Sequence, residues 1–126
     1  MPSSKDTGAK DRRKVIKGRR FEQLAAEFYQ KQGFAILEQN WRSGHKEIDL
    51  IVRKDRQIVF VEVKASSSNA FGHPAERVDR RKITLLTAAA QSYLQKAKIA
   101  GCDLRFDVIT FNKGKLEHFP NAFEAA

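Results

Sequence analysis

The sequence predicts an α/β fold in which helices flank a mixed sheet of four to five strands. Apolar residues repeat at helical spacing in two segments, 19–32 and 75–97. Between and after these segments lie runs rich in Ile, Val and Phe, which favour strands. The resulting order is α-β-β-β-α-β without internal repeats, and 126 residues suffice for one domain with its own core.

The first helix is expected over residues 19–32, and Gly33 suits its C-terminal cap. Its apolar stripe consists of Phe21, Leu24, Ala25 and Phe28. A first strand is expected over residues 34–41, where apolar side chains are frequent, followed by a loop over 42–45.

Residues 46–64 are typical of a β-hairpin whose two-residue loop is Asp55-Arg56. In this register Asp49 faces Glu62, and side chains alternate between the two faces. One face then carries Ile48, Leu50, Val52, Val59, Val61 and Val63. The other face carries Glu47, Asp49, Glu62 and Lys64, with Ile51 and Phe60 nearer the turn. A shift of one residue would mix the two sets, so the separation itself favours this register.

The three carboxylates and one ammonium on the second face predict a site for a divalent cation. Two carboxylates about 5 Å apart repel by roughly 3 kcal/mol at an effective dielectric near 20, which is more than a favourable cross-strand pair returns. Lys64 offsets only one acid, whereas Mg²⁺ binds through one or two carboxylates and keeps several waters. The alternative is a salt-bridge network in which Lys64 pairs with Glu47 and Asp49.

The second half of the chain adds a helix and further strands. A long helix is expected over residues 75–97, with Pro74 at its start and Glu76 near the positive end of its dipole. Residues 104–111 form the next strand, which we expect to run parallel to the end of the hairpin through a right-handed crossover. Residues 115–119 add a short edge strand.

The net charge of +9 is concentrated at the N-terminus, because residues 1–20 hold eight basic and two acidic residues. We expect a basic, disordered arm over residues 1–17, a domain over 18–120 and a C-terminal tail over 121–126. Excess positive charge favours polyanionic partners, of which nucleic acid is the commonest. The sequence has no apolar stretch of membrane-span length, no signal peptide and a single cysteine, Cys102, which together predict a cytoplasmic protein.

The motifs resemble those of the PD-(D/E)xK nuclease superfamily, which includes restriction endonucleases and Holliday junction resolvases, and specifically those of the YraN-like family of small bacterial proteins. The matching segments are Gly18-Arg19-Arg20-Phe21-Glu22, Asn40-Trp41-Arg42, Glu47-Ile48-Asp49-Leu50-Ile51, Phe60-Val61-Glu62-Val63-Lys64, Lys82 and Arg105-Phe106-Asp107. The resemblance implies a restriction-endonuclease-like core. Phe21 and Lys46 stand where that family usually has Gly, and Ala65-Ser66 replaces a polar-Arg pair.

By this resemblance the protein hydrolyses DNA phosphodiesters with Mg²⁺, for which Mn²⁺ can substitute. The metal ligands would be Asp49, Glu62 and the carbonyl of Val63, with Glu47 as an alternate ligand. Lys64 would orient or deprotonate the attacking water and stabilise the developing phosphorane charge. Glu22 matches a first-helix acid that reaches the catalytic site in resolvase-like relatives, and its alternative is an ordinary surface helix position.

For other charged and aromatic residues the sequence indicates a role less specifically. Candidate phosphate contacts are Arg42, Lys46, Arg80, Arg81 and Lys82, although a solvated helix face explains the last three equally well. His45, His73 and His118 lack metal-ligand spacing and are expected in loops or on the surface. Asp107 is expected to serve structure, and Trp41 and Tyr93 to belong to the core.

Three functional hypotheses follow from the sequence. The first is a Mg²⁺-dependent endonuclease that acts on DNA rather than RNA, on branched or damaged substrates, as a homodimer like the resolvases. The second is a nucleic-acid-binding module of the same fold without turnover, motivated by Phe21 and Lys46. The third is an adaptor whose basic arm docks an acidic protein partner.

Overall fold

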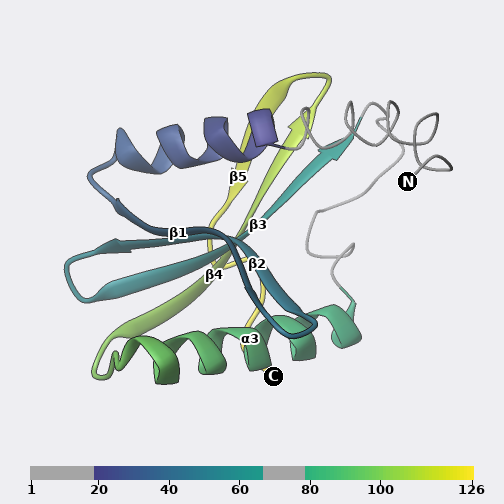
Figure 1. Ribbon diagram of the computed structural model, residues 1–126. Coiled ribbons are helices and arrows are strands. Elements are labelled where there is room, and N and C mark those ends of the chain that lie inside the picture. The colour runs from purple at the N-terminus through teal and green to yellow at the C-terminus, as the bar shows by residue number, and fades with distance from the viewer. Residues whose placement is uncertain (1–18, 67–78) are drawn as a thin grey trace, which may run out of the picture.

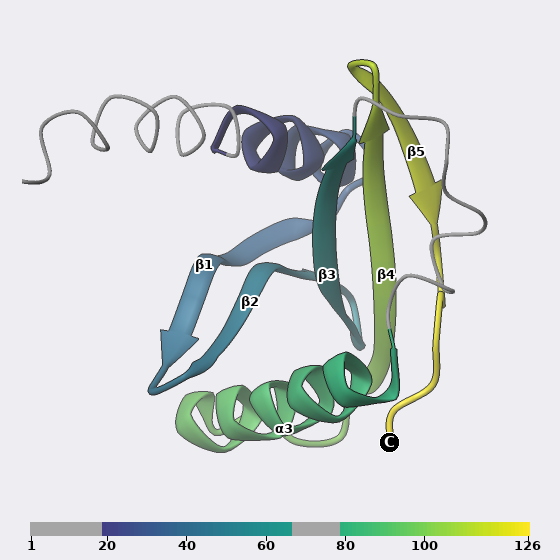
Figure 2. The same cartoon turned by 90° about the vertical axis from the view of Figure 1, so that its right-hand side faces the viewer.

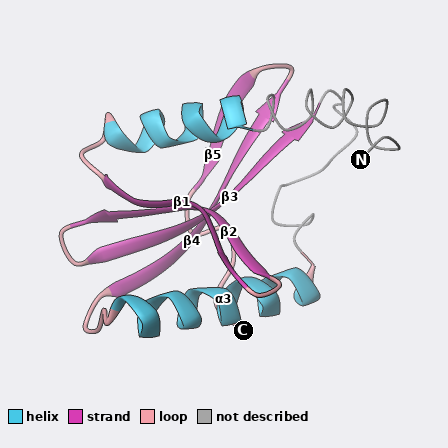
Figure 3. Cartoon of the chain, viewed as in Figure 1, coloured by secondary structure: helices cyan, strands magenta, loops and turns pink. Residues whose placement is uncertain are grey.

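The computed structural model describes residues 19–66 and 79–126, which form one five-stranded sheet flanked by two helices (Figure 3). An N-terminal helix covers residues 19–30. The other elements are β1 (Ala35–Ser43), β2 (Lys46–Lys54), β3 (Gln57–Ser66), α3 (Arg80–Ala97), β4 (Asp103–Asn112) and β5 (Lys115–Phe119). Strand β1 continues to Ser43, so the loop expected over 42–45 shrinks to residues 44–45.

The sheet is mixed, as predicted. Its strand order is β1-β2-β3-β4-β5, and β3 and β4 are parallel whereas the other described neighbours are antiparallel. Helix α3 lies between β3 and β4 in the chain, because a parallel pair needs a crossover connection. Figure 1 shows the N-terminal helix and α3 on opposite sides of the sheet. The predicted α/β fold class, with its restriction-endonuclease-like order of elements, is confirmed.

Each helix covers one face of the sheet through its own apolar cluster. The buried members on the side of the N-terminal helix are Ala25, Ala26, Tyr29, Leu50, Val52, Val59, Val61, Ile109 and Phe111. Those on the α3 side are Ile48, Ile51, Ile58, Phe60, Leu86, Ala89, Ala90, Tyr93, Phe106 and Val108. Strands β2 and β3 supply both clusters because their side chains alternate between faces. Trp41 and Tyr93 meet edge-on in the α3 cluster, as expected for core residues.

The predicted register of β2 and β3 is confirmed where the two strands pair. Leu50 pairs with Val61 at one end, and Lys54 pairs with Gln57 beside the Asp55-Arg56 turn at the other. The ladder ends at Leu50, so the next expected pair is not part of it. Figure 2 shows the β1–β2 hairpin bending away from β3. The two strands therefore diverge at the acidic segment of β2.

The prediction that Ile48 shares a face with Leu50 is wrong. Leu50 packs on the side of the N-terminal helix, whereas Ile48 belongs to the α3 cluster. The change of face falls between the pairs Gln39–Leu50 and Trp41–Ile48, where Asn40 has a φ of 53°. This left-handed conformation is costly for most residues but accessible to Asn. Asn40 thus sits at the bend of the hairpin.

Helix α3 begins at Arg80, later than predicted. Asp79 is its N-cap, and the Asp79 side chain accepts a hydrogen bond from the backbone amide of Lys82 at 2.9 Å. Such a cap satisfies an amide that otherwise has no helical partner. The expected start at Pro74 is therefore wrong, and Asp79 is the residue that caps the helix. The basic arm over 1–17, His73, Pro74 and Glu76 lie outside the described residues.

A buried polar cluster around Asp107 joins the N-terminal helix to β4 and β5. The fully buried carboxylate accepts hydrogen bonds from the Tyr29 hydroxyl at 2.7 Å and from the Arg105 guanidinium at 2.8 Å. His118 Nε2 lies 2.8 Å from the same carboxylate, and the Asn121 amide donates at 3.0 Å. The structural role predicted for Asp107 is confirmed. His118 is not the surface residue we expected, because its side chain is only 19% exposed.

Residues 121–126, expected to form a tail, contact the domain. The ring of Phe123 stacks on Phe106 with centroids 5.1 Å apart, and the Ala122 amide donates to the Phe106 carbonyl at 2.8 Å. The Ala126 amide donates to the Thr87 hydroxyl at 3.0 Å. Neither helix of the described chain has the length and hydrophobicity needed to cross a membrane.

Candidate functional site

The site develops where β2 and β3 separate. Asp49 lies one residue beyond the last ladder pair, and its Oδ2 accepts a hydrogen bond from the backbone amide of Val63 at 2.8 Å. The carboxylate of Asp49 thus bridges the diverging strands in place of a main-chain pair. This contact fixes one of its oxygens and holds it at the segment that carries Glu62 and Lys64.

Asp49 is strongly perturbed by its surroundings. Burial raises its pKa most, and the negative charge of Glu62 raises it further, while the Val63 hydrogen bond lowers it. The charges of Glu22 and Glu47 add to the increase, and the pKa reaches about 7. Carboxylates from the N-terminal helix, β2 and β3 therefore all act on Asp49 at this point.

Glu62 has a cationic partner on α3. Its carboxylate lies 3.4 Å from Lys82 Nζ, and the Glu62 side chain is only 13% exposed. Lys82 stands in the first turn of α3, where the Asp79 cap holds its backbone. The N-terminus of α3 therefore places an ammonium group beside an acid of the candidate metal site.

Glu22 brings an unsatisfied oxygen to the same region. It is half-buried, and its Oε2 is buried without a hydrogen-bond partner among the described residues. A buried carboxylate oxygen without a partner is costly, so the position is not that of an ordinary surface helix residue. Its charge acts on Asp49, which places Glu22 beside the acids of the sheet.

The donor set fits a hard divalent cation. Carboxylates of Asp49 and Glu62 and the carbonyl of Val63 offer oxygen ligands, and an orphaned Glu22 oxygen lies nearby. Within 19–66 and 79–126 no three His, Cys, Asp or Glu side chains are already arranged as a metal-binding cluster. A Mg²⁺ site needs only one or two carboxylates because water completes its shell, so two acids and a carbonyl are sufficient.

Lys64 borders a basic hollow at the start of α3. It lines a hollow of about 270 Å³ together with Asp79, Arg81, Lys82 and Leu85. No salt bridge within the described part of the chain joins Lys64 to Glu47 or Asp49. The alternative network of ion pairs centred on Lys64 is therefore not formed there. Among the described residues, an anionic group in the hollow would meet three cationic side chains and one acid.

Glu47 and two of the predicted phosphate contacts have other partners. Glu47 pairs with Arg42 at 3.5 Å, and both side chains are exposed. Lys46 Nζ donates to Ser92 Oγ of α3 at 3.1 Å. Lys96 Nζ donates to the hydroxyl of Ser43 at the other end of the same turn. These two lysine contacts tie the tip of the β1–β2 hairpin to α3.

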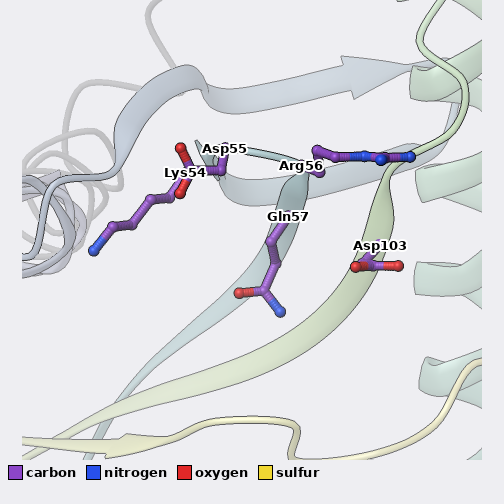
Figure 4. A pocket seen from close by; sticks show the side chains of 5 residues that line it. All are labelled: Lys54, Asp55, Arg56, Gln57 and Asp103. Atoms are coloured by element: carbon purple, nitrogen blue, oxygen red, sulfur yellow. The ribbon is translucent and has the colours of Figure 1, made fainter.

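Arg80 and Arg81 are exposed at the start of α3, and Arg81 joins Lys82 at the hollow. A second hollow of about 410 Å³ lies at the β2–β3 turn and contains none of the predicted site residues. It is lined by Lys54, Asp55, Arg56, Gln57 and Asp103 (Figure 4). Its cations are engaged elsewhere: Lys54 donates to the Gln32 carbonyl at 2.8 Å, and Arg56 donates to the Gly101 carbonyl at 3.1 Å.

Besides the hydrogen bond from the Val63 amide to Asp49, sequence reasoning missed three contacts that shape the site. The Asp79 cap had a signal, since an Asp directly before a helix is a preferred N-cap. The pairing of Lys82 with Glu62 and the contact of Lys46 with Ser92 had none, because each joins segments whose relative placement depends on the folded sheet.

The fold and the acidic site define a small α/β protein with a candidate cation site at a fork in its sheet. Residues 21–111 match the model of the uncharacterised protein family UPF0102. A UPF0102 protein of Persephonella marina is 39% identical over 109 residues, which span 86% of this chain and 94% of that protein. One from Chloroherpeton thalassium is 45% identical over 95 residues (75% and 74%), and one from Syntrophomonas wolfei is 42% identical over 106 (81% and 92%). The chain belongs to the UPF0102 family, as its YraN-like motifs led us to expect.

Proposed function

We propose that this protein is a Mg²⁺-dependent endonuclease of the PD-(D/E)xK type that hydrolyses DNA phosphodiesters. The observation that carries the proposal is the contact between the Asp49 carboxylate and the Val63 amide at 2.8 Å. It brings Asp49 to the segment in which Glu62 and Lys64 follow two residues apart. Burial and the charge of Glu62 raise the pKa of Asp49 to about 7. Such a combination of causes is expected at functional sites.

Each residue has a defined task in the proposed reaction. Asp49, Glu62 and the Val63 carbonyl would hold Mg²⁺, which supplies Lewis-acid activation of the phosphoryl group and of a water molecule. Lys64, at the basic hollow, would orient the attacking water and offset the negative charge that develops on the phosphoryl oxygens. Glu22 would accept a hydrogen bond from a water at its partnerless oxygen.

The proposal extends to partners and location. The excess of basic residues in the first 20 positions suits the phosphate backbone of DNA, with Arg80 and Arg81 as exposed contacts near the hollow. By analogy with resolvases we propose a homodimer, active in the cytoplasm on branched or damaged DNA. Mn²⁺ is expected to replace Mg²⁺.

Cleavage assays test the proposal directly. Supercoiled plasmid, single strands and four-way junctions are incubated with the full chain in Mg²⁺, Mn²⁺ or EDTA. We expect metal-dependent cleavage that Lys64→Ala and Glu62→Gln abolish, while Lys115→Ala, which removes an exposed lysine on β5, leaves it unchanged. Absence of metal-dependent cleavage on all three substrates, or cleavage that survives Lys64→Ala, contradicts the proposal.

A second candidate function is a DNA-binding module without turnover. Two observations favour it: Phe21, at a position where a Gly is usual, packs on Phe111 with ring centroids 4.7 Å apart, and Lys46, at another, is engaged by Ser92. This reading predicts salt-dependent DNA binding that Lys64→Ala preserves, without cleavage in any metal. Cleavage that depends on both metal and Lys64 excludes it.

A further inference from the structure

Lys82 borders two environments of opposite charge. On one side its ammonium lies 3.4 Å from the carboxylate of Glu62. On the other it lines the basic hollow with Lys64 and Arg81. The Lys82 side chain is 37% exposed, whereas that of Glu62 is 13% exposed. The lysine is therefore the more accessible partner, and its ammonium is carried on a flexible four-carbon stem.

The ion pair with Glu62 occupies a ligand that the proposed cation also needs. Asp49 is crowded by other carboxylates, so without a divalent ion the site holds excess negative charge. Among the described residues, Lys82 is the cation that pairs with Glu62. A divalent ion bound to Asp49 and Glu62 would repel the Lys82 ammonium. It would also neutralise Glu62, so the ion pair between Lys82 and Glu62 would no longer be favourable. The hollow is the adjacent space into which the side chain can turn, and the Asp79 carboxylate there already accepts from the Lys82 amide.

We propose that Lys82 exchanges between two partners: it neutralises Glu62 when no divalent cation is bound, and it turns into the hollow to hold a substrate phosphate once a cation takes Glu62. This inference rests on the proposed function and deepens it. Cation and phosphate then bind cooperatively, because the cation releases a positive charge for the phosphate. Thermodynamic linkage requires the converse as well.

Mn²⁺ affinity, measured by electron paramagnetic resonance on the full chain, tests the first half. Lys82→Met removes the competing ammonium and should tighten Mn²⁺ binding about three- to fivefold, the range of a partly exposed ion pair. Arg81→Met is the matched control, since it removes a charge from the same hollow without touching the Glu62 pair, and should stay within about twofold of wild type. Lys82→Arg keeps the charge and should bind Mn²⁺ no more tightly than wild type.

Binding of a short single-stranded oligonucleotide tests the second half. In EDTA, Lys82→Met should weaken binding only slightly, because Lys82 is held by Glu62 and makes no phosphate contact. With Ca²⁺, which takes the same oxygen ligands, Lys82→Met should bind several-fold more weakly and with a salt slope reduced by about one phosphate contact. Arg81→Met should weaken binding equally in both conditions.

The outcomes separate this inference from the proposed function. If wild type binds Mn²⁺ and Lys82→Met binds it with the same affinity, the proposed exchange of Lys82 is wrong. The nuclease proposal is then unaffected. An equal loss of oligonucleotide affinity for Lys82→Met with and without Ca²⁺ also overturns it. If neither wild type nor Lys82→Met binds Mn²⁺, the exchange and the metal-dependent function fall together.

Discussion

The carboxylate of Asp49 accepts a hydrogen bond from the Val63 amide at 2.8 Å, across the point where β2 leaves β3. A side chain thus takes over from the main-chain ladder. This substitution of a side chain for a main-chain pair places the Asp49 carboxylate between the two diverging strands and fixes one of its oxygens. It also concentrates negative charge, which burial makes unfavourable unless a cation or a proton arrives.

Removing the charge of Asp49 should stabilise the metal-free protein. Asp49→Asn keeps an acceptor for the Val63 amide and removes repulsion from Glu62, so we expect a gain of at least about 1 kcal/mol at pH 7.5. For a domain of this size that is several degrees in Tm. Asp49→Ala is the control, because it leaves the amide unpaired and should cost about 1–3 kcal/mol relative to Asn. Thermal denaturation in EDTA measures both, and a lower Tm for Asp49→Asn than for wild type would contradict the account.

The same residue should make stability depend on pH. The pKa of Asp49 is raised in the fold from 3.8 to about 7, so the folded state binds more protons than the unfolded state between these values. Wild-type stability should therefore fall as pH rises from about 4 to about 7, relative to Asp49→Asn, and the difference should level off above that range. Urea denaturation in EDTA at successive pH values measures this difference in free energy. A difference that stays constant with pH is incompatible with the raised pKa.

Asn40 should be required for the bend that turns the hairpin toward α3. Its φ of 53° favours Asn or Gly, so Asn40→Gly should be tolerated. Asn40→Val should cost about 1–2 kcal/mol, the penalty of a left-handed residue with a branched side chain. The free energies of unfolding of the two variants give the test. Equal stability of Asn40→Val and Asn40→Gly would show that the bend does not depend on this conformation.

The Asp107 cluster should dominate stability at acidic pH. Burial alone would raise the pKa of Asp107, but hydrogen bonds from His118, Arg105, the Asn121 amide and Tyr29 lower it to about 2. The ionised carboxylate therefore stabilises the fold above its ordinary pKa of 3.8, and this contribution, about 2 kcal/mol, is lost as pH falls toward 2.

Two substitutions check the cluster. Asp107→Ala should lower the free energy of unfolding by about 3–5 kcal/mol at pH 7, because it leaves the largely buried Arg105 guanidinium without its carboxylate partner. Tyr29→Phe should lower it by only about 1 kcal/mol. Urea denaturation at pH 7 and at pH 3 measures both. An Asp107→Ala variant as stable as wild type at neutral pH is the contrary result.

The sequence predicts the fold well because the relevant signals are local. The two-residue Asp55-Arg56 turn, with alternation on both sides, is enough to set the register from Leu50 to Val61. The apolar spacing in α3 likewise predicts its end at Ala97. The start of α3 differs from the prediction because the helix is capped by Asp79 and not begun at Pro74.

The site is less accessible to sequence reasoning because it depends on long-range placement. Strict alternation put Ile48 on the wrong face, since the bend at Asn40 interrupts the period of two. Alternation gave no hint that Asp49 would bond to the Val63 amide rather than face Glu62 in a ladder. His118 gave no signal of burial, because its partner Asp107 lies on a neighbouring strand.

The proposed nuclease function depends on a cation that binds between the acids of β2 and β3. Crystals soaked with Mn²⁺ test this most directly, through the position of the anomalous scattering peak. We expect one peak within bonding distance of the carboxylates of Asp49 and Glu62 and of the Val63 carbonyl, and none in the same soak of Asp49→Asn crystals. A soaked wild-type crystal without a peak there, or with its peak elsewhere, would rule out this cation site.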